Sequence, residues 1–228
     1  MAHISTHAYA KYHTALFELM RGDRERAAQN ASEVARLARG HDLPDWRAVG
    51  AFLEGLATAE RGTLGEGLSD MRRSAELLRE QNFLFFDGLL KIALAEAEAR
   101  AGDPDRALAV LDEALATSDR TGFRAFDAEL HRARGESLLK RDLANLAPAE
   151  DALLTAIAVA GRQGTRSFQL RAALSLAKLY QATGRPAEAH AALTPALEGF
   201  APTPEMPEIA EAQTLLVAIE AGAHARHE

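Results

Sequence analysis

The chain has 228 residues, a formal net charge of −7 and no cysteine, and 47% of its residues are hydrophobic. The negative charge gives little electrostatic support to a nucleic-acid-binding role. The lack of cysteine excludes disulfides, thiol nucleophiles and zinc sites built on cysteine, and it fits a reducing cytoplasm.

The N-terminal segment, MAHISTHAYAKYH, lacks the apolar stretch of a secretory signal. No run in the sequence approaches the roughly 20 apolar residues that are needed to cross a bilayer. We therefore expect a soluble, cytoplasmic protein with no membrane role. Ala and Leu dominate whereas Val, Ile and Thr are sparse, and we find no alternating strand pattern. This composition favours helices, so the expected fold class is all-α.

Turn residues recur along the chain at a nearly constant interval. One series is spaced by 40, 40, 40 and 42 residues, and a second series between its members is spaced by 42, 40 and 42. Glycine suits helix ends because the left-handed conformation costs it no Cβ clash, and Asn is its usual substitute. Two interleaved series predict two helices per unit, joined by short turns. The series are Gly22, Gly62, Gly102, Asp142 and Gly184, and Gly40, Asn82, Gly122 and Gly164.

Small residues keep step with the turns of the first series. They stand seven residues before the turn and five residues after it, where they would let neighbouring helices approach closely. Pro104 and Pro186 each follow their glycine by two residues and are expected to begin a helix. The small residues are Ala15, Gly55, Ala95, Gly135 and Ala177, then Ala27, Gly67, Ala107 and Ala189, with Ala149 fitting if two residues are inserted near Asn145.

The segment SLAKLYQATGRPAEAHAAL (Ser175–Leu193) resembles a tetratricopeptide repeat, with small Ala177, aromatic Tyr180 and turn Gly184. Such repeats typically have 34 residues, whereas these units have 40–42. The resemblance implies a right-handed α-solenoid of about five helix pairs, forming a single domain over 1–228. The expected units are about 5–40, 41–82, 83–122, 123–164 and 165–200, with a capping helix at about 204–221 and a disordered tail at 222–228.

A narrower resemblance covers much of the chain from about Pro44 onward. AELHRARGESLLKRD (Ala128–Asp142), SFQLRAALSLAKLYQATGR and PEIAEAQTLL are similar to the C-terminal helical-repeat region of large bacterial signalling proteins. Those proteins carry a nucleotide-cyclase or DNA-binding domain and a signal-transducing NTPase domain ahead of the repeats. The resemblance implies a regulatory role, either as a free-standing relative or as a piece of such a protein.

Motifs that carry chemistry are weak in this sequence. The glycine-rich turn RGTLGEGL lacks the lysine of a phosphate-binding loop. His3 and His7 lie four residues apart but have no third ligand nearby, and His131 is interpreted as a polar or packing residue. Carboxylate pairs fall at helical surface spacings and are interpreted as solvated faces. We expect no catalytic residue, no metal and no cofactor, and therefore not an enzyme. The carboxylate pairs are Glu96 with Glu98 and Glu129 with Glu136.

Residues 13, 10 and 6 positions before each turn are expected to face the inside of the solenoid. The N-terminal half of this face would be apolar and the C-terminal half charged. Two interpretations stay open: a partner-binding groove, or ordinary core. The sets are Tyr9, Tyr12 and Leu16; Val49, Phe52 and Leu56; Leu89, Ile92 and Glu96; Glu129, Arg132 and Glu136; Arg171, Leu174 and Lys178. The candidate groove residues are Tyr9, Tyr12, Val49, Phe52, Leu56, Leu89, Ile92, Arg132, Arg171 and Lys178.

The sequence therefore predicts a non-catalytic interaction or regulatory module that binds a protein or peptide partner, or other domains of a larger signalling protein. The alternative is a small-metabolite sensor that uses the solenoid interior. A third hypothesis is a homodimer formed through Tyr9, Tyr12 and Phe17. Trp46, just after Pro44, would either staple the helix start of the second unit or anchor an interface. The three phenylalanines of NFLFFDG (Asn82–Gly88) would either plug a gap between units or be exposed for a partner.

Overall fold

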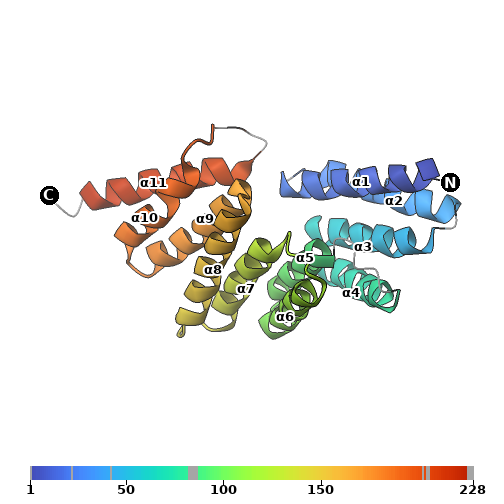
Figure 1. Ribbon diagram of the computed structural model, residues 1–228, viewed down its shortest axis with the longest axis horizontal. Coiled ribbons are helices and arrows are strands. Elements are labelled where there is room, and N and C mark those ends of the chain that lie inside the picture. Colours follow the sequence, from blue (N-terminus) through green and yellow to red (C-terminus); the bar gives the residue numbers. More distant parts are fainter. Residues whose placement is uncertain are drawn as a thin grey trace. The chain divides into compact units, whose positions relative to one another are not determined.

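The computed structural model describes residues 2–21, 23–41, 43–81, 87–201, 203 and 206–224. These residues form eleven α-helices and no strand (Figure 1). The chain divides into two compact units, Met1–Val110 and Leu111–Glu228, which we describe separately. Helix α6 (Pro104–Thr121) spans the boundary between them.

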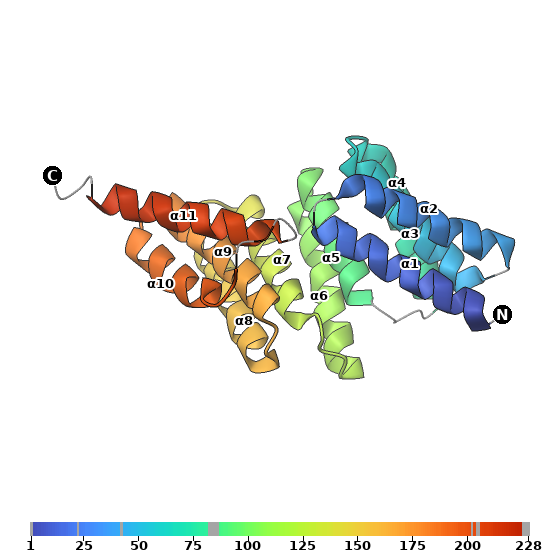
Figure 2. The ribbon, with the colours of Figure 1, turned by 90° about the horizontal axis from the view of Figure 1, so that it is seen from above.

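Unit 1 is built from consecutive helices that pack in antiparallel pairs (Figures 1 and 2). Each helix contacts the next one along the chain, and α3 also contacts α1 and α5. Helix α3 therefore contacts the four other helices of the unit. The helices are α1 (Ala2–Met20), α2 (Arg24–Gly40), α3 (Pro44–Glu60), α4 (Leu64–Glu80) and α5 (Asp87–Arg100).

Unit 2 repeats the same arrangement. Its helices also pack on their chain neighbours, α7 lies beside α9, and α11 lies on α9 and α10 (Figure 1). Helix α11 thus takes the place that the first helix of a further pair would occupy. The helices are α7 (Asp127–Arg141), α8 (Ala147–Gln163), α9 (Arg166–Ala182), α10 (Pro186–Leu197) and α11 (Pro207–His224).

The turns follow the chemistry of their residues. Gly102 and Gly164 have φ values of +89° and +67°, the left-handed conformation that ends a helix without a Cβ clash. Pro104 and Pro186 begin α6 and α10 as the sequence predicts. The side chain of Asp103 accepts a hydrogen bond of 3.0 Å from the backbone N–H of Arg106, which caps the start of α6.

The predicted fold class is confirmed: the described chain is all-α and is built from repeated helix pairs. The expected capping helix corresponds to α11. Helix α11 continues to His224, so the first three residues of the tail expected to be disordered are helical. Gly22, Asn82, the three phenylalanines of NFLFFDG and residues 225–228 lie outside the described residues. The single domain over 1–228 stays a prediction.

Each unit has its own hydrophobic core. In unit 1 the core includes the fully buried side chains of Phe52, Leu53 and Met71. In unit 2 it includes Leu170 and Leu193. Burial of large aliphatic and aromatic side chains contributes about 1.5–3 kcal/mol for each residue, so these clusters hold the helix pairs together. No helix within the described residues has the length and apolar character to span a membrane.

Candidate functional site

The apolar candidate residues of unit 1 belong mainly to its core. Tyr12 on α1 is 2% exposed, and Phe52 is fully buried on α3, which contacts α1, α2, α4 and α5. This burial favours the core interpretation over an open groove in unit 1. Val49, Leu56 and Ile92 are also buried, Leu89 is half-buried, and Tyr9 is 39% exposed.

Trp46 fills a gap in unit 1. Its partly buried side chain packs against the core, and its ring meets those of Tyr9 and Tyr12 edge-on, with centroids 6.4 Å and 6.1 Å away. Of the two interpretations left open for Trp46, this packing supports the structural one. Phe17, on the last turns of α1, is 67% exposed.

The charged candidate residues of unit 2 come together between α7 and α9. Arg132 is 4% exposed, and its Nε lies 3.1 Å from both carboxylate oxygens of Glu129, which is 2% exposed. Arg171 Nη1 on α9 lies 2.9 Å from the same carboxylate. The structure thus joins Arg132 and Arg171 through one buried carboxylate.

Glu136 extends this network toward the surface. Its Oε1 lies 2.9 Å from Arg132 Nη1 and accepts a hydrogen bond of 2.6 Å from the Ser175 hydroxyl. Burial acts to raise the pKa of Glu136, but the charges of Arg132 and Arg171 and the hydrogen bonds from Ser175 and Arg132 outweigh it, so the pKa is lowered. The negative charge of Glu136 is therefore already neutralised by the neighbouring arginines of the protein.

The interpretation of the acidic pairs as solvated faces is wrong for Glu129 and for Glu98. Glu98 on α5 is fully buried, 2.7 Å from Arg72 Nε on α4 and 3.1 Å from Arg106 Nε on α6. Both arginines at Glu98 come from neighbouring helices, whereas at Glu129 the neighbouring helix α9 supplies Arg171 and α7 itself supplies Arg132. A buried carboxylate needs such partners, because desolvation otherwise costs several kcal/mol.

A pocket of about 470 Å³ opens between the C-terminal turns of α7 and α9. Its apolar lining includes Leu139, Leu146 and Leu179, which also border the core of unit 2. Polar side chains lie among the other lining residues, so the pocket offers both an apolar surface and charge. The remaining lining residues are Glu136, Lys140, Leu143, Ser175, Lys178, Ala182 and Thr183.

The pocket forms at a departure from the repeat pattern. The turns at Gly62, Gly102 and Gly184 each join two helices through three residues, whereas α7 and α8 are joined by five, residues 142–146. Asp142 has an extended backbone with φ −150°, and its side chain accepts a hydrogen bond from Ala144 N–H. The longer connection carries two of the leucines that line the pocket.

Two lysines lie at the pocket. Lys178, the candidate residue from the sequence, is half-exposed, and its Nζ lies 2.7 Å from Glu211 on α11. Lys140 is exposed on the last turn of α7 and has neither an ion pair nor a hydrogen bond within the described residues. Sequence reasoning missed Lys140 and Leu143, although the two-residue insertion near Asn145 marked the place.

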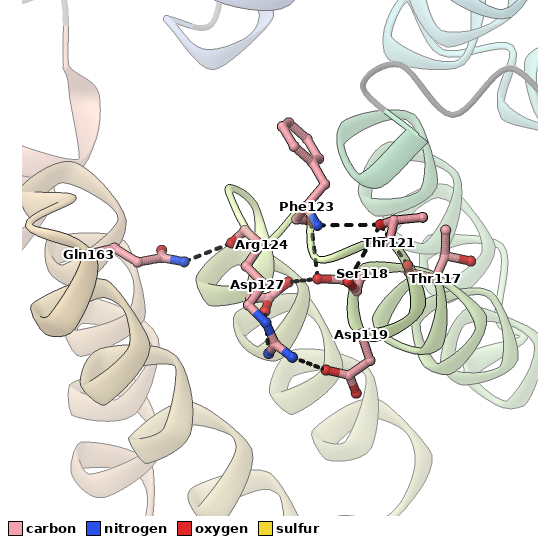
Figure 3. Close-up of polar contacts among 8 residues, drawn as sticks. All are labelled: Thr117, Ser118, Asp119, Thr121, Phe123, Arg124, Asp127 and Gln163. Atoms are coloured by element: carbon pink, nitrogen blue, oxygen red, sulfur yellow. Dashed lines mark hydrogen bonds and ion pairs between the residues drawn. The ribbon is translucent and has the colours of Figure 1, made fainter.

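The connection between α6 and α7 is ordered by polar contacts, shown in Figure 3. Ser118 Oγ lies 2.5 Å from Asp127 Oδ1, and Arg124 Nη2 lies 2.6 Å from Asp119 Oδ1. The ring of Phe123 points away from these groups and is 52% exposed. The network fixes the loop.

The histidines form no recognisable site in the described chain. Burial lowers the pKa of His131, with opposing contributions from Asp127 and Asp119, so its imidazole is neutral near neutral pH. His3 and His7 are both exposed on α1. Among the described residues, no three His, Asp or Glu side chains are placed to hold a metal ion.

Comparison with solved structures identifies the fold. The TPR-like repeats of a Podosopora anserina protein described as a putative kinesin light chain superpose with a TM-score of 0.56 at 15% identity, covering 98% of this chain and 99% of that one. A variant form of those repeats gives a TM-score of 0.59 at 16% identity, over 86% of this chain and 95% of that one. At this identity the likeness shows the fold alone: the chain has a TPR-like helical-repeat fold.

Comparison by sequence gives less. No protein-family model matches the chain. An uncharacterised protein of Rhizobium meliloti (strain 1021) is 28% identical over 183 residues, which are 78% of this chain. The matched region is 18% of that protein, so the chain spans less than a fifth of the relative's length.

Proposed function

We propose that this chain is a non-catalytic module that binds a protein or peptide partner through the pocket between α7 and α9. The observation that carries the proposal is that the pocket forms where the α7–α8 connection breaks the repeat, with leucines at its surface and with Lys140, which has no ion pair among the described residues. Exposed apolar surface rimmed by polar groups is typical of interaction sites. The TPR-like fold supports the same interpretation, because α-solenoids offer extended binding faces.

We also propose that the module is the partner-binding or sensor part of a bacterial signalling protein in the cytoplasm. The much longer Rhizobium relative supports a setting with further domains, since the matched region is only 18% of it. In such a setting the partner is either a separate protein or another domain of the same chain.

Site-specific photo-crosslinking tests the partner-binding function. A photoreactive residue replaces Leu143, which lines the pocket and is 77% exposed. The matched control replaces Leu154 on α8, which is 45% exposed and outside the pocket lining. After irradiation in a lysate of the source organism, we expect a defined protein adduct from position 143 and none from 154.

Equal labelling at both positions, or no adduct at position 143, would contradict partner binding at this pocket. A sedimentation experiment at several concentrations, run on the same samples, shows whether an adduct with the mass of two chains reflects self-association. That outcome would replace a foreign partner with a second copy.

The alternative function, a small-metabolite sensor, has one observation in its favour. The pocket volume of about 470 Å³ lies within the roughly 300–1,000 Å³ of small-molecule sites. A metabolite panel screened by thermal unfolding distinguishes it. A ligand that stabilises the intact chain but not the Leu143→Asp variant supports the sensor, since binding to the folded state raises its stability. If no compound of the panel behaves in this way, the result contradicts the sensor function.

A further inference from the structure

We infer that the pocket takes an aliphatic side chain presented by an acidic segment of the partner protein. This inference rests on the proposed function and names the chemistry of the partner. It follows from three features of the same site: an apolar surface continuous with the core, an inserted loop that extends this surface, and two lysines at the rim, one of them without an acidic partner among the described residues.

The inner lining of the pocket is apolar and belongs to or packs against the core of unit 2. Leu179 is 6% exposed and belongs to the core of unit 2, and Leu139 and Leu146 pack against that core. An aliphatic side chain that enters the pocket would contact these leucines, which the core of unit 2 already holds in place. Each CH₂ group that it buries there is removed from water, which favours binding. The pocket therefore favours an aliphatic group over a polar one.

Leu143 extends this surface outward. It is 77% exposed on the five-residue connection, so most of its side chain is not buried by the protein itself. The Asp142 side chain accepts a hydrogen bond from Ala144 N–H, which shapes the connection beside the pocket. A partner segment lying along the connection would cover Leu143 while inserting its own side chain between α7 and α9.

The charged side chains at the pocket favour acidic residues on either side of the partner's inserted side chain. Glu136 already interacts with Arg132 and Ser175, so it does not balance the lysines at the pocket. Lys178 has Glu211 at 2.7 Å, and Lys140 has no acidic partner within the described chain. The whole chain carries a net charge of −7, so its overall charge does not attract an acidic segment and the attraction must be local. Lys140 thus attracts such a segment and fixes where it docks.

Peptide display against the intact chain tests this chemistry. A randomised peptide library is selected on the wild-type chain after depletion on a Lys140→Glu, Leu143→Ser variant. Both positions are exposed and outside the core, so we expect the variant to melt at the wild-type temperature. Enriched peptides are expected to carry Leu, Ile or Val flanked by Asp or Glu.

Single variants measure each contribution with a fluorescent copy of an enriched peptide. Lys140→Glu is expected to weaken binding about tenfold or more, and added salt to weaken wild-type binding. The control is Arg162→Glu, an exposed cation on the last turn of α8, which is expected to change affinity less than about twofold. Leu143→Ser is expected to weaken binding, and Leu154→Ser to leave it unchanged.

Enrichment of basic, aromatic or uncharged peptides, or no enrichment, would overturn the inference. So would an acidic peptide that binds the Lys140→Glu chain as well as the wild type. None of these results decides the proposed function, because the crosslink from position 143 tests partner binding whatever the partner's charge. A crosslinked partner together with non-acidic peptides would therefore leave the function standing and remove only the chemistry.

Discussion

Helices α3 and α4 meet where Gly55 faces Gly67. A Cβ atom added to Gly55 would lie 2.8 Å from the carbonyl oxygen of Gly67, and one added to Gly67 would overlap the backbone of Gly55 and Ala59. The two glycines therefore permit direct backbone contact between the helices. They occupy the positions seven residues before and five residues after the turn, where the other units carry small residues.

Replacing Gly67 with Ala is expected to destabilise the protein. The nearest atoms belong to the backbone of α3, which cannot move aside as a side chain can. Overpacking of this kind typically costs about 1–3 kcal/mol. Urea unfolding followed by circular dichroism measures the loss, and an unchanged free energy of unfolding would show that the helices can separate at no cost.

Gly65 provides the matched control. It also lies in α4, but a Cβ atom added there meets nothing within 4 Å. Gly65 is the second residue of α4, so Gly65→Ala is expected to stabilise the protein by less than the roughly 0.5–1 kcal/mol that this exchange gives in mid-helix, since alanine is the better helix former. Opposite signs for the two substitutions would confirm that close packing, and not helix propensity, requires Gly67.

Removing the guanidinium of Arg132 is expected to be strongly destabilising. Arg132→Ala leaves Glu129, which is 2% exposed, with Arg171 as its remaining ion-pair partner among the described residues. Breaking a buried ion pair by removing one partner costs about 3–5 kcal/mol. Arg134→Ala is the control: it breaks the more exposed pair with Asp112 and is expected to cost less than about 1 kcal/mol.

A second substitution separates charge from packing in the Arg132 prediction. In the Arg132→Ala background, Glu129→Gln removes the carboxylate that has lost one of its arginine partners. The double variant is expected to recover part of the lost stability, measured as the coupling in a double-mutant cycle. No recovery would mean that the loss comes from the space that the arginine side chain filled.

The sequence predicts the helix pairs well because a helix end is a local property. Gly102 and Pro104 end and begin helices through their own backbone preferences, whatever surrounds them. The burial of Glu98 and Glu129, in contrast to a helix end, is not a local property. Spacing along one helix shows which residues share a face, but the helix that covers that face comes from elsewhere in the chain. Burial of these carboxylates could therefore not be derived from spacing alone.

The pH dependence of stability provides a test of His131. Burial lowers its pKa below the ordinary value of 6.5, with Asp127 opposing and Arg134 adding to the shift. The folded state therefore binds the proton less readily than the unfolded state. The stability that neutral His131 provides is present above pH 6.5 and is lost as the pH falls through the lowered pKa of the folded state.

His131→Gln removes this titration. Relative to wild type, the variant is expected to lose less stability as the pH falls below 6.5, the ordinary value for histidine. Urea unfolding at a series of pH values measures the difference in slope. Parallel profiles for the two proteins would contradict a lowered pKa, because an unshifted histidine contributes no pH dependence.

Shortening the α7–α8 connection tests whether the departure from the repeat creates the binding site. Deleting Ala144 and Asn145 leaves three residues, as in the turns at Gly62, Gly102 and Gly184. The helix pair is expected to stay folded, because loop length itself changes stability by only about 0.6 kcal/mol for each doubling. Leu143 and Leu146 would be drawn away from the pocket, so binding of an enriched acidic peptide is expected to fall about tenfold or more while the melting temperature is retained. Full binding by the shortened chain would show that α7 and α9 alone make the site.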